Sequence, residues 1–244
     1  MKDYLQDLIE HTHGLGCIEL VKVTGTDKVT QIAAISEDKN VILEGEFNAP
    51  VADFIGTFGM PNLTKLKTIL GLNDYDNESK ISMKRGTADD PNAPANIHFE
   101  TKLGDFVNDY RLMNKTLVEE KVKTIKLKVT PVWNVEFEPT VAGIMRLKSQ
   151  VTANSEEVHV TVKTENNELK MYFGDPSTHS GNFVFHQSVT GTLKNKQVWS
   201  VKQFQAIMEL SGDKKVRLSD QGLAEITVDS GLAVYRYFLP SQSK

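Results

Sequence analysis

The feature that most constrains the fold is the order of secondary-structure signals, which repeats once along the chain. Each half carries a helical segment, about three short strands, a second helical segment and again about three strands. A helix buries one apolar stripe and a strand buries one face, so each half needs both elements to enclose a core. The repeat therefore predicts an α+β fold made of two copies of one domain, each with two helices packed on antiparallel sheets.

The helices are predicted from apolar residues three or four positions apart and from glycines that follow them. They are expected over residues 2–13, 62–70, 140–151 and 201–210. In the third helix we expect these side chains to point inward: Val141, Ile144, Met145, Leu147 and Val151.

The strands are predicted from short runs of β-branched residues that turn-forming residues separate. In the first half they are expected over residues 18–24, 29–35, 41–47, 80–85, 96–102 and 105–113. In the second half they are expected over residues 133–137, 158–164, 168–173, 182–189, 197–200, 215–219, 224–229 and 232–239.

The segment between the halves interleaves lysines with apolar residues, the lysines being Lys121, Lys123, Lys126 and Lys128. This pattern fits either a linker or an exposed edge strand that its lysines protect from unwanted pairing. We therefore expect a first domain over residues 1–115, a connector over residues 116–131 and a second domain over residues 132–244.

Charge and cysteine content exclude several classes of protein. Lys and Arg number 28 against 32 Asp and Glu, for a net charge of −4, so any nucleic-acid contact must use a local basic surface. The lone Cys17 excludes an internal disulfide and favours a reducing compartment. The polar N-terminus and the short apolar runs give no sign of export or of a membrane span, and we expect a cytoplasmic protein.

Catalytic and metal-binding motifs fail on specific residues. Residues 74–79 resemble the start of a calcium loop, but Ser79 and Arg85 stand where such a loop needs Gly and a bidentate Glu. His11 and His13 are two positions apart, so a helix would point them in different directions. The pair Asp89 and Asp90 falls in the polar segment 86–94, which is typical of a solvated loop. The sequence thus predicts a protein that is not an enzyme and that needs neither metal nor cofactor.

Cations on the helices are the remaining informative pattern. Lys65 and Lys67 lie on the second helix, Arg146 and Lys148 on the third, and Lys202 at the start of the fourth. The outward faces of these helices are otherwise small and polar. The pattern fits a DNA-facing surface or an ordinary solvated face, and it does not separate the two.

Four collinear motifs carry a resemblance to a known family. Residues 135–146, Val-Glu-Phe-Glu-Pro-Thr-Val-Ala-Gly-Ile-Met-Arg, resemble the segment that opens the second domain of ring-shaped DNA sliding clamps, which include proliferating cell nuclear antigen. Residues 108–112 are similar to the last strand of the first clamp domain, residues 62–70 to its second helix, and residues 235–240 to the C-terminus of the family. In size and divergence the chain looks most like the trimeric clamps of T-even-type bacteriophages.

The sequence also departs from the family in two places. The first helix carries Asp3, Asp7 and Glu10 against Lys2, so a basic lining is not expected there. The segment 86–94 is also longer than the resemblance would lead us to expect.

The resemblance implies a homotrimeric ring of two-domain subunits, with helices lining a pore inside antiparallel sheets. Such a ring encircles duplex DNA and tethers the replicative DNA polymerase as a processivity factor, with a clamp loader ATPase complex as a further partner. It implies that the five helix cations face DNA. For ring closure we expect residues 80–85 or 96–102 to pair with residues 168–173 or 182–189 of a neighbouring subunit.

The resemblance also implies a pocket for a partner peptide, formed by Leu117, Val118, Val122, Tyr237, Phe238, Leu239 and Pro240. Because side chains alternate along a strand, part of the segment 237–240 is expected to form an exposed apolar patch. The alternative is a nucleic-acid-binding protein that forms no ring, which would be expected to interleave aromatic and basic residues. Here the 11 Phe, 6 Tyr and 2 Trp mostly fall on strands in patterns that suit a core.

Overall fold

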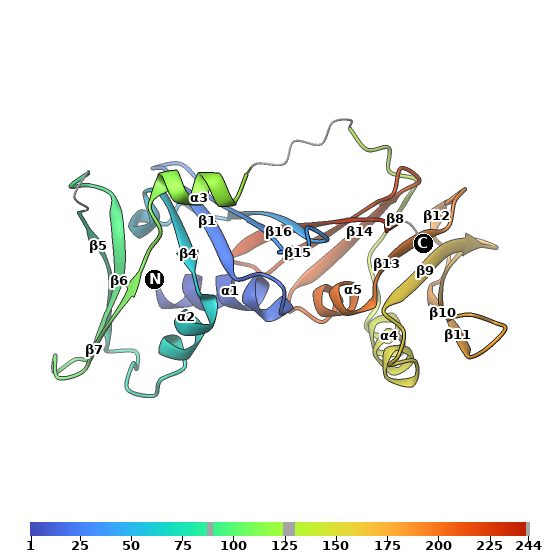
Figure 1. The fold of residues 1–244 in the computed structure, drawn as a ribbon, viewed down its shortest axis with the longest axis horizontal. Coiled ribbons are helices and arrows are strands. Elements are labelled where there is room, and N and C mark those ends of the chain that lie inside the picture. The colour runs from blue at the N-terminus through green and yellow to red at the C-terminus, as the bar shows by residue number, and fades with distance from the viewer. Residues whose placement is uncertain (87–89, 124–129, 243–244) are drawn as a thin grey trace. The chain divides into compact units, whose positions relative to one another are not determined.

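The structure is a computed structural model that describes residues 1–86, 90–123 and 130–242. It divides into two compact units (Figure 1). Unit 1 comprises Met1–Lys39, Leu43–Ile125 and Ser230–Tyr235, and unit 2 comprises Asn40–Ile42, Lys126–Asp229 and Arg236–Lys244. Each unit combines antiparallel sheets with helices, so the predicted α+β class is confirmed. Within the described residues, no helix is long and apolar enough to cross a membrane.

The main sheet of unit 1 has the strand order β3-β2-β1-β4. Its strands are β1 (Leu20–Gly25), β2 (Thr30–Ile35), β3 (Ile42–Phe47) and β4 (Gly56–Pro61). The sequence did not predict β4, because its two glycines and its proline are typical of turns. Antiparallel pairing with β1 from Leu20–Pro61 to Gly25–Gly56 makes it a strand.

Two helices lie on one face of this sheet (Figure 1). They are α1 (Lys2–His11), which is followed by the short helix η1 (His13–Leu15), and α2 (Leu63–Leu70). A short helix, η2 (Ala52–Phe54), precedes β4. The aromatic ring of Tyr235 stacks on buried His11 at 4.5 Å between ring centres, and its hydroxyl donates to Asp7 Oδ2 at 2.7 Å. These contacts fix α1 to the last strand of the chain.

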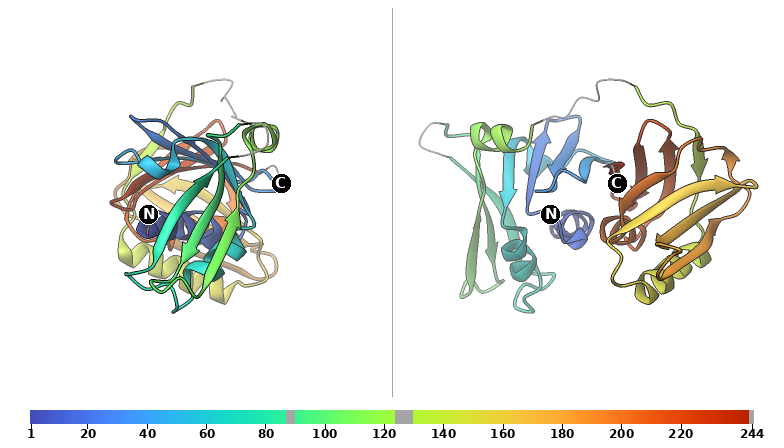
Figure 2. Two further views of the ribbon diagram at one scale, coloured as in Figure 1. Left: turned by 90° about the vertical axis from the view of Figure 1, so that its left-hand side faces the viewer. Right: turned by 45° about the vertical axis from the view of Figure 1, so that its right-hand side comes forward.

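A second sheet of unit 1 contains β5 (Lys80–Arg85), β6 (Pro94–Glu100) and β7 (Val107–Arg111), with β6 in the centre (Figure 2, left). The expectation that residues 96–102 form an edge strand is therefore wrong, because β6 bonds to a strand on each side. Within the described residues, β5 and β7 are the edges of this sheet, and residues 80–85 remain a candidate for pairing.

The start of the predicted connector is a helix, α3 (Lys115–Lys121), and neither a linker nor a strand. The side chain of Asn114 caps it by accepting from the Leu117 N–H at 2.9 Å. Val118 packs on β4 at Gly59, where an added Cβ would lie 2.8 Å from the Val118 Cγ2 atom. Gly59, one of the residues that kept β4 from being predicted, is thus what allows α3 to pack closely on β4. Residues 124–129, which include Lys126 and Lys128, lie outside the described residues.

Unit 2 also has two sheets. One has the order β12-β8-β14-β15, formed by β8 (Val135–Phe137), β12 (Thr190–Gly191), β14 (Asp213–Ser219) and β15 (Leu223–Asp229). The other has the order β11-β10-β9-β13, formed by β9 (His159–Glu165), β10 (Glu168–Gly174), β11 (Ser180–His186) and β13 (Gln197–Ser200). The helices of this unit are α4 (Val141–Ala153) and α5 (Val201–Met208). Residues 168–173 form the central strand β10, so their predicted role at an edge is wrong, whereas β11 is an edge within the described residues.

The last strand, β16 (Ala233–Pro240), corrects the expectation of an exposed apolar patch. Tyr237, Phe238 and Leu239 are all buried, so the predicted exposed patch does not form from them. A strand covered on both faces buries successive side chains despite their alternation. In the predicted peptide pocket Val118 and Val122 are buried as well, which leaves Leu117 exposed and Pro240 half-buried.

The two tryptophans provide a test of this packing. Trp199 is buried and its Nε1 donates to Leu239 O at 3.0 Å, whereas Trp133 is half-buried beside Arg217. Trp199→Phe removes volume and leaves the Leu239 carbonyl without its donor, and should lower the free energy of unfolding by about 2–4 kcal/mol. Trp133→Phe is the matched control and should cost less than about 1 kcal/mol. Urea unfolding followed by circular dichroism measures both, and equal costs would show that the C-terminal strand is not held as described.

Candidate nucleic-acid interface

In unit 1 the candidate cations lie on the exposed side of α2. Asn62, in the left-handed conformation, caps the helix, and its side chain accepts from the Lys65 N–H at 3.2 Å. Leu63, Leu66, Ile69 and Leu70 are buried. Because these apolar residues fix the orientation of the helix, Lys65 and Lys67 face solvent.

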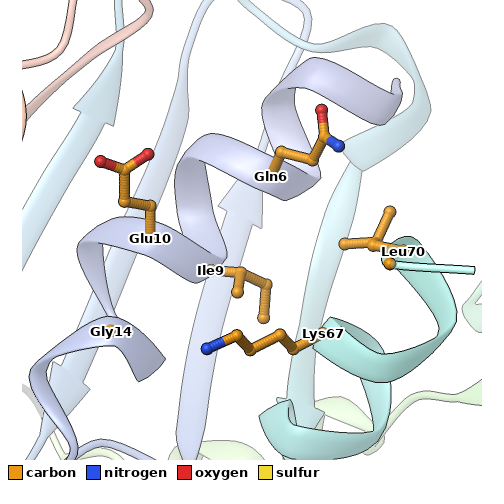
Figure 3. Close-up of a pocket in the computed structure, with 7 residues that line it drawn as sticks. Gln6, Ile9, Glu10, Gly14, Lys67 and Leu70 are labelled. Atoms are coloured by element: carbon orange, nitrogen blue, oxygen red, sulfur yellow. The ribbon is translucent and has the colours of Figure 1, made fainter.

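Lys67 lies beside a shallow pocket of about 310 Å³ between α2 and α1. Figure 3 shows its side chain extending from α2 beneath Ile9 of α1. Gln6, Glu10 and Leu70 also line this pocket. Lys67 is exposed although it lines this pocket, so its ammonium group remains available to an anion.

The exposed side of α1 is acidic, as its sequence predicts. Asp3 and Glu10 are exposed, and Lys2 is occupied, because its Nζ donates to Tyr75 O at 2.6 Å. Asp7 is held by Tyr235. Unit 1 therefore offers a phosphate backbone the two lysines of α2 and little from α1.

In unit 2 the orientation of α4 differs in part from the sequence prediction. Val141 and Met145 are 75% and 65% exposed, so they do not point inward, and Leu147 is the buried anchor. Gly143 explains the rotation, because a Cβ there would lie 2.6 Å from Phe185 O of β11. Helix α4 therefore contacts the sheet on the side of Gly143, and the spacing of apolar residues in the sequence does not reveal such a contact.

The three cations of unit 2 are all exposed but differ in their partners. Arg146 donates to Val184 O at 3.3 Å, and Lys148 Nζ lies 3.5 Å from Glu209 Oε1 near the end of α5. Lys202 is the second residue of α5, which the hydroxyl of Ser200 caps by accepting from the Gln203 N–H. The ion pair between Lys148 and Glu209 joins two helices that are far apart in the sequence, so no local sequence pattern could have predicted it.

Lysines on the sheets are paired more often than those on the helices. Lys163 and Lys170 lie 2.7 and 3.3 Å from the carboxylate of Glu165. This carboxylate accepts hydrogen bonds from Lys163, Tyr172 and Lys170, which lower the pKa of Glu165 to about 2. On β14, burial lowers the pKa of Lys214, which donates to the carbonyls of Leu210 and Gly212. These lysines are committed to structure, so the helix faces are the better candidates for binding an anion.

The acidic segments form no metal site in the described part of the chain. No group of three or more His, Cys, Asp or Glu side chains there is arranged to hold an ion. Asp76 instead accepts from the Glu78 N–H at 2.9 Å and the Ser79 hydroxyl at 3.1 Å, which lowers the pKa of its carboxyl. The carboxylate of Asp76 thus has hydrogen-bond partners within its own turn and needs no metal ion.

The fold resembles solved structures of proliferating cell nuclear antigen (PCNA). The structure of the protein from Entamoeba histolytica matches with a TM-score of 0.71 and 13% identity, over 99% of this chain and 96% of that one. PCNA from Thermococcus kodakaraensis gives 0.66 and 12%, over 99% and 97%. A structure of the C-terminal region of FEN-1 bound to A. fulgidus PCNA gives 0.67 and 9%, over 100% and 95%. Comparison of the sequence with protein-family models and with curated proteins finds no match.

At such identities the likeness establishes the fold. The chain has the two-domain clamp fold along its full length, and the resemblance read from the sequence motifs is confirmed at that level.

The orientation of α4 can be tested with a pair of substitutions. Leu147→Ala removes a buried anchor and should lower the free energy of unfolding by about 2–5 kcal/mol. Met145→Ala, on the exposed side, should change it by no more than about 0.5 kcal/mol. Denaturant unfolding of the two variants measures the difference, and a larger loss for Met145→Ala would mean that the cations of α4 face the core side.

Proposed function

We propose that this chain is the subunit of a homotrimeric sliding clamp that encircles duplex DNA and tethers the replicative DNA polymerase as a processivity factor. The observation that carries the proposal is the clamp fold over the full chain, combined with exposed cations on a helix of each helix pair. The protein would have no catalytic activity of its own. We keep the domain limits 1–115 and 132–244, with the connector 116–131, as part of this proposal.

The charge pattern suits a ring that slides. Lys65, Lys67, Arg146, Lys148 and Lys202 would meet phosphates without reading bases, so their contacts could be exchanged along the duplex. Few cations are needed, because a closed ring holds DNA by topology. The net charge of −4 would discourage DNA from lying on the outside.

Ring closure would use free strand edges. Strands β5 and β7 of unit 1 and strand β11 of unit 2 each have a hydrogen-bonded neighbour on one side only within the described residues. Pairing an edge of one subunit with an edge of the next repeats a single head-to-tail contact, which closes a ring after three steps if the rotation fits.

The partners follow from the same proposal. One of the similar structures contains the C-terminal region of FEN-1 on PCNA, which supports a peptide of the DNA polymerase, and of a clamp loader ATPase complex, as the ligand here. Of the pocket residues predicted from sequence, Leu117 and Pro240 are accessible and would contact the peptide, whereas Val118, Val122, Tyr237, Phe238 and Leu239 are buried. The resemblance to clamps of T-even-type bacteriophages leads us to propose action in the cytoplasm of a host cell.

The oligomeric state is the first test. Native mass spectrometry or sedimentation equilibrium at tens of micromolar should give about three times the subunit mass of 27.3 kDa. A monomer or dimer throughout this range would contradict the ring and favour a nucleic-acid-binding protein that forms none.

The DNA-facing cations can be tested by charge substitution. Arg146→Ala combined with Lys148→Ala should weaken association with duplex DNA and reduce the slope of log affinity against log salt by about one for each lost phosphate contact. Glu209→Gln frees Lys148 from its ion pair and should strengthen association up to about fivefold at low salt. Lys163→Ala, on a sheet lysine paired with Glu165, is the control and should change neither quantity. Unchanged salt slopes in the double variant would remove α4 from the DNA path.

A further inference from the structure

A groove crosses unit 1 beside the first turn of α3. Two adjoining depressions of about 670 and 440 Å³ form it, and they share Asp90, Pro94, Asn114 and Lys115 among their lining residues. The first depression extends to Ile55 and Thr57 of the β4 region, and the second to Arg111 and Leu117. Because they share these lining residues, the two depressions adjoin, and we call them together the groove.

The groove exists because a strand stops early. Gly59 and Met113 exchange both backbone hydrogen bonds, at 2.9 and 2.8 Å, so the chain at Met113 pairs with the outer edge of β4. In an antiparallel ladder residue 115 would next face Thr57. Instead Asn114 caps α3 and Lys115 turns away as its first residue. The place opposite Thr57 is left open.

Thr57 therefore presents an unused strand edge to the groove. Hydrogen bonding alternates along a strand, so Thr57 and Gly59 direct their N–H and C=O groups to the same side, away from β1. Among the described residues, no backbone or side-chain group bonds to Thr57 from that side. An extended peptide placed there would gain a pair of main-chain hydrogen bonds.

The groove is rigid on the side of β5. Arg85 donates from its guanidinium to three backbone carbonyls, those of Ile55 at 2.9 Å, Asn92 at 3.0 Å and Asp53 at 3.1 Å. These bonds tie η2, the start of β4 and the loop before β6 to one side chain. A wall that is already fixed loses little entropy when a ligand binds.

Charge and apolar exposure indicate the occupant. Among the described residues that line the groove, Arg85, Arg111 and Lys115 are cationic and Asp90 is the one carboxylate, on a protein whose net charge is −4. Ile55 and Leu117, 44% and 48% exposed, supply apolar surface toward the two ends. The groove thus has the opposite sign to the whole protein and complements carboxylates flanked by apolar side chains.

We propose that this groove binds an extended segment of a partner protein in which acidic and apolar residues alternate, as a short strand added to the edge of β4. The inference goes beyond the clamp function, since it needs neither DNA nor a ring. It shares Leu117 with the peptide site proposed above and Arg111 with β7, a candidate edge for ring closure, but Thr57 and Lys115 belong to the groove alone, so substitutions at these two residues separate the sites.

The probe is a fluorescein-labelled, amidated peptide, Leu-Glu-Val-Asp-Val-Leu, titrated against the full chain by fluorescence anisotropy. Its control is Leu-Gln-Val-Asn-Val-Leu, which has the same shape without charge. We expect the acidic peptide to bind and the amide peptide to bind at least about tenfold more weakly. Equal affinities, or no binding of either peptide up to millimolar protein, would overturn the proposal.

Two sets of variants locate the binding. The charge-reversal variant Lys115→Glu, at an exposed position outside β7, should weaken the acidic peptide at least about threefold. Thr57→Pro removes the free N–H and should weaken both peptides, while Thr57→Ser keeps it and should weaken neither. If Thr57→Pro fails to fold by circular dichroism, the charge-reversal variant decides alone.

Two other occupants would contradict the proposal. A lower native mass in the charge-reversal variant would make the groove a contact between copies of this chain. Displacement of the peptide by duplex DNA in wild type, with weaker DNA binding in the charge-reversal variant, would make it a nucleic-acid surface. An unchanged mass and unchanged DNA binding, together with lost peptide binding, are the expected results.

Discussion

The rest of the structure depends on one constraint, which is that each helix carrying a candidate cation must bury one face on a sheet, an apolar stripe in α2 and α5 and the face of Gly143 and Leu147 in α4. In unit 1 the stripe of α2 is Leu63, Leu66, Ile69 and Leu70, and in unit 2 the stripe of α5 includes Phe204, Ile207 and Met208. Once these residues are buried, the position of every cation on the opposite side follows from helical geometry. The proposed function rests on those opposite sides.

The sequence predicted most of the elements because their cores are periodic, and it failed where a contact depends on distant residues. The expected helix over residues 62–70 matches α2 (Leu63–Leu70), and residues 197–200 match β13. Strand β4 and helix α3 were both missed, because in the sequence Gly59 indicates a turn, whereas in the structure it makes room for Val118 of α3. The rotation of α4 was missed because it depends on the approach of Gly143 to β11. The candidate cations were found and are exposed, but the pairing of Lys148 with Glu209 had no signal in the sequence.

Electrostatics separate the surfaces of the molecule. On the sheets, several lysines are paired at short range, as with Lys163 and Glu165 at 2.7 Å and Lys215 and Glu136 at 2.6 Å. On the helices, weaker pairing leaves cations available, though α1 contributes carboxylates. A surface so lightly charged would hold DNA poorly by attraction alone. The proposed function therefore requires enclosure, which makes ring topology the central claim.

Enclosure can be measured without a loader or a polymerase. A linear duplex is immobilised at one end, incubated with the protein at high concentration, blocked at its free end with streptavidin and washed in high salt. A closed ring should remain on the blocked duplex and leave when a restriction enzyme cuts it, because salt screens attraction but does not break a topological link. Equal loss from blocked and unblocked duplexes during the wash would contradict the account.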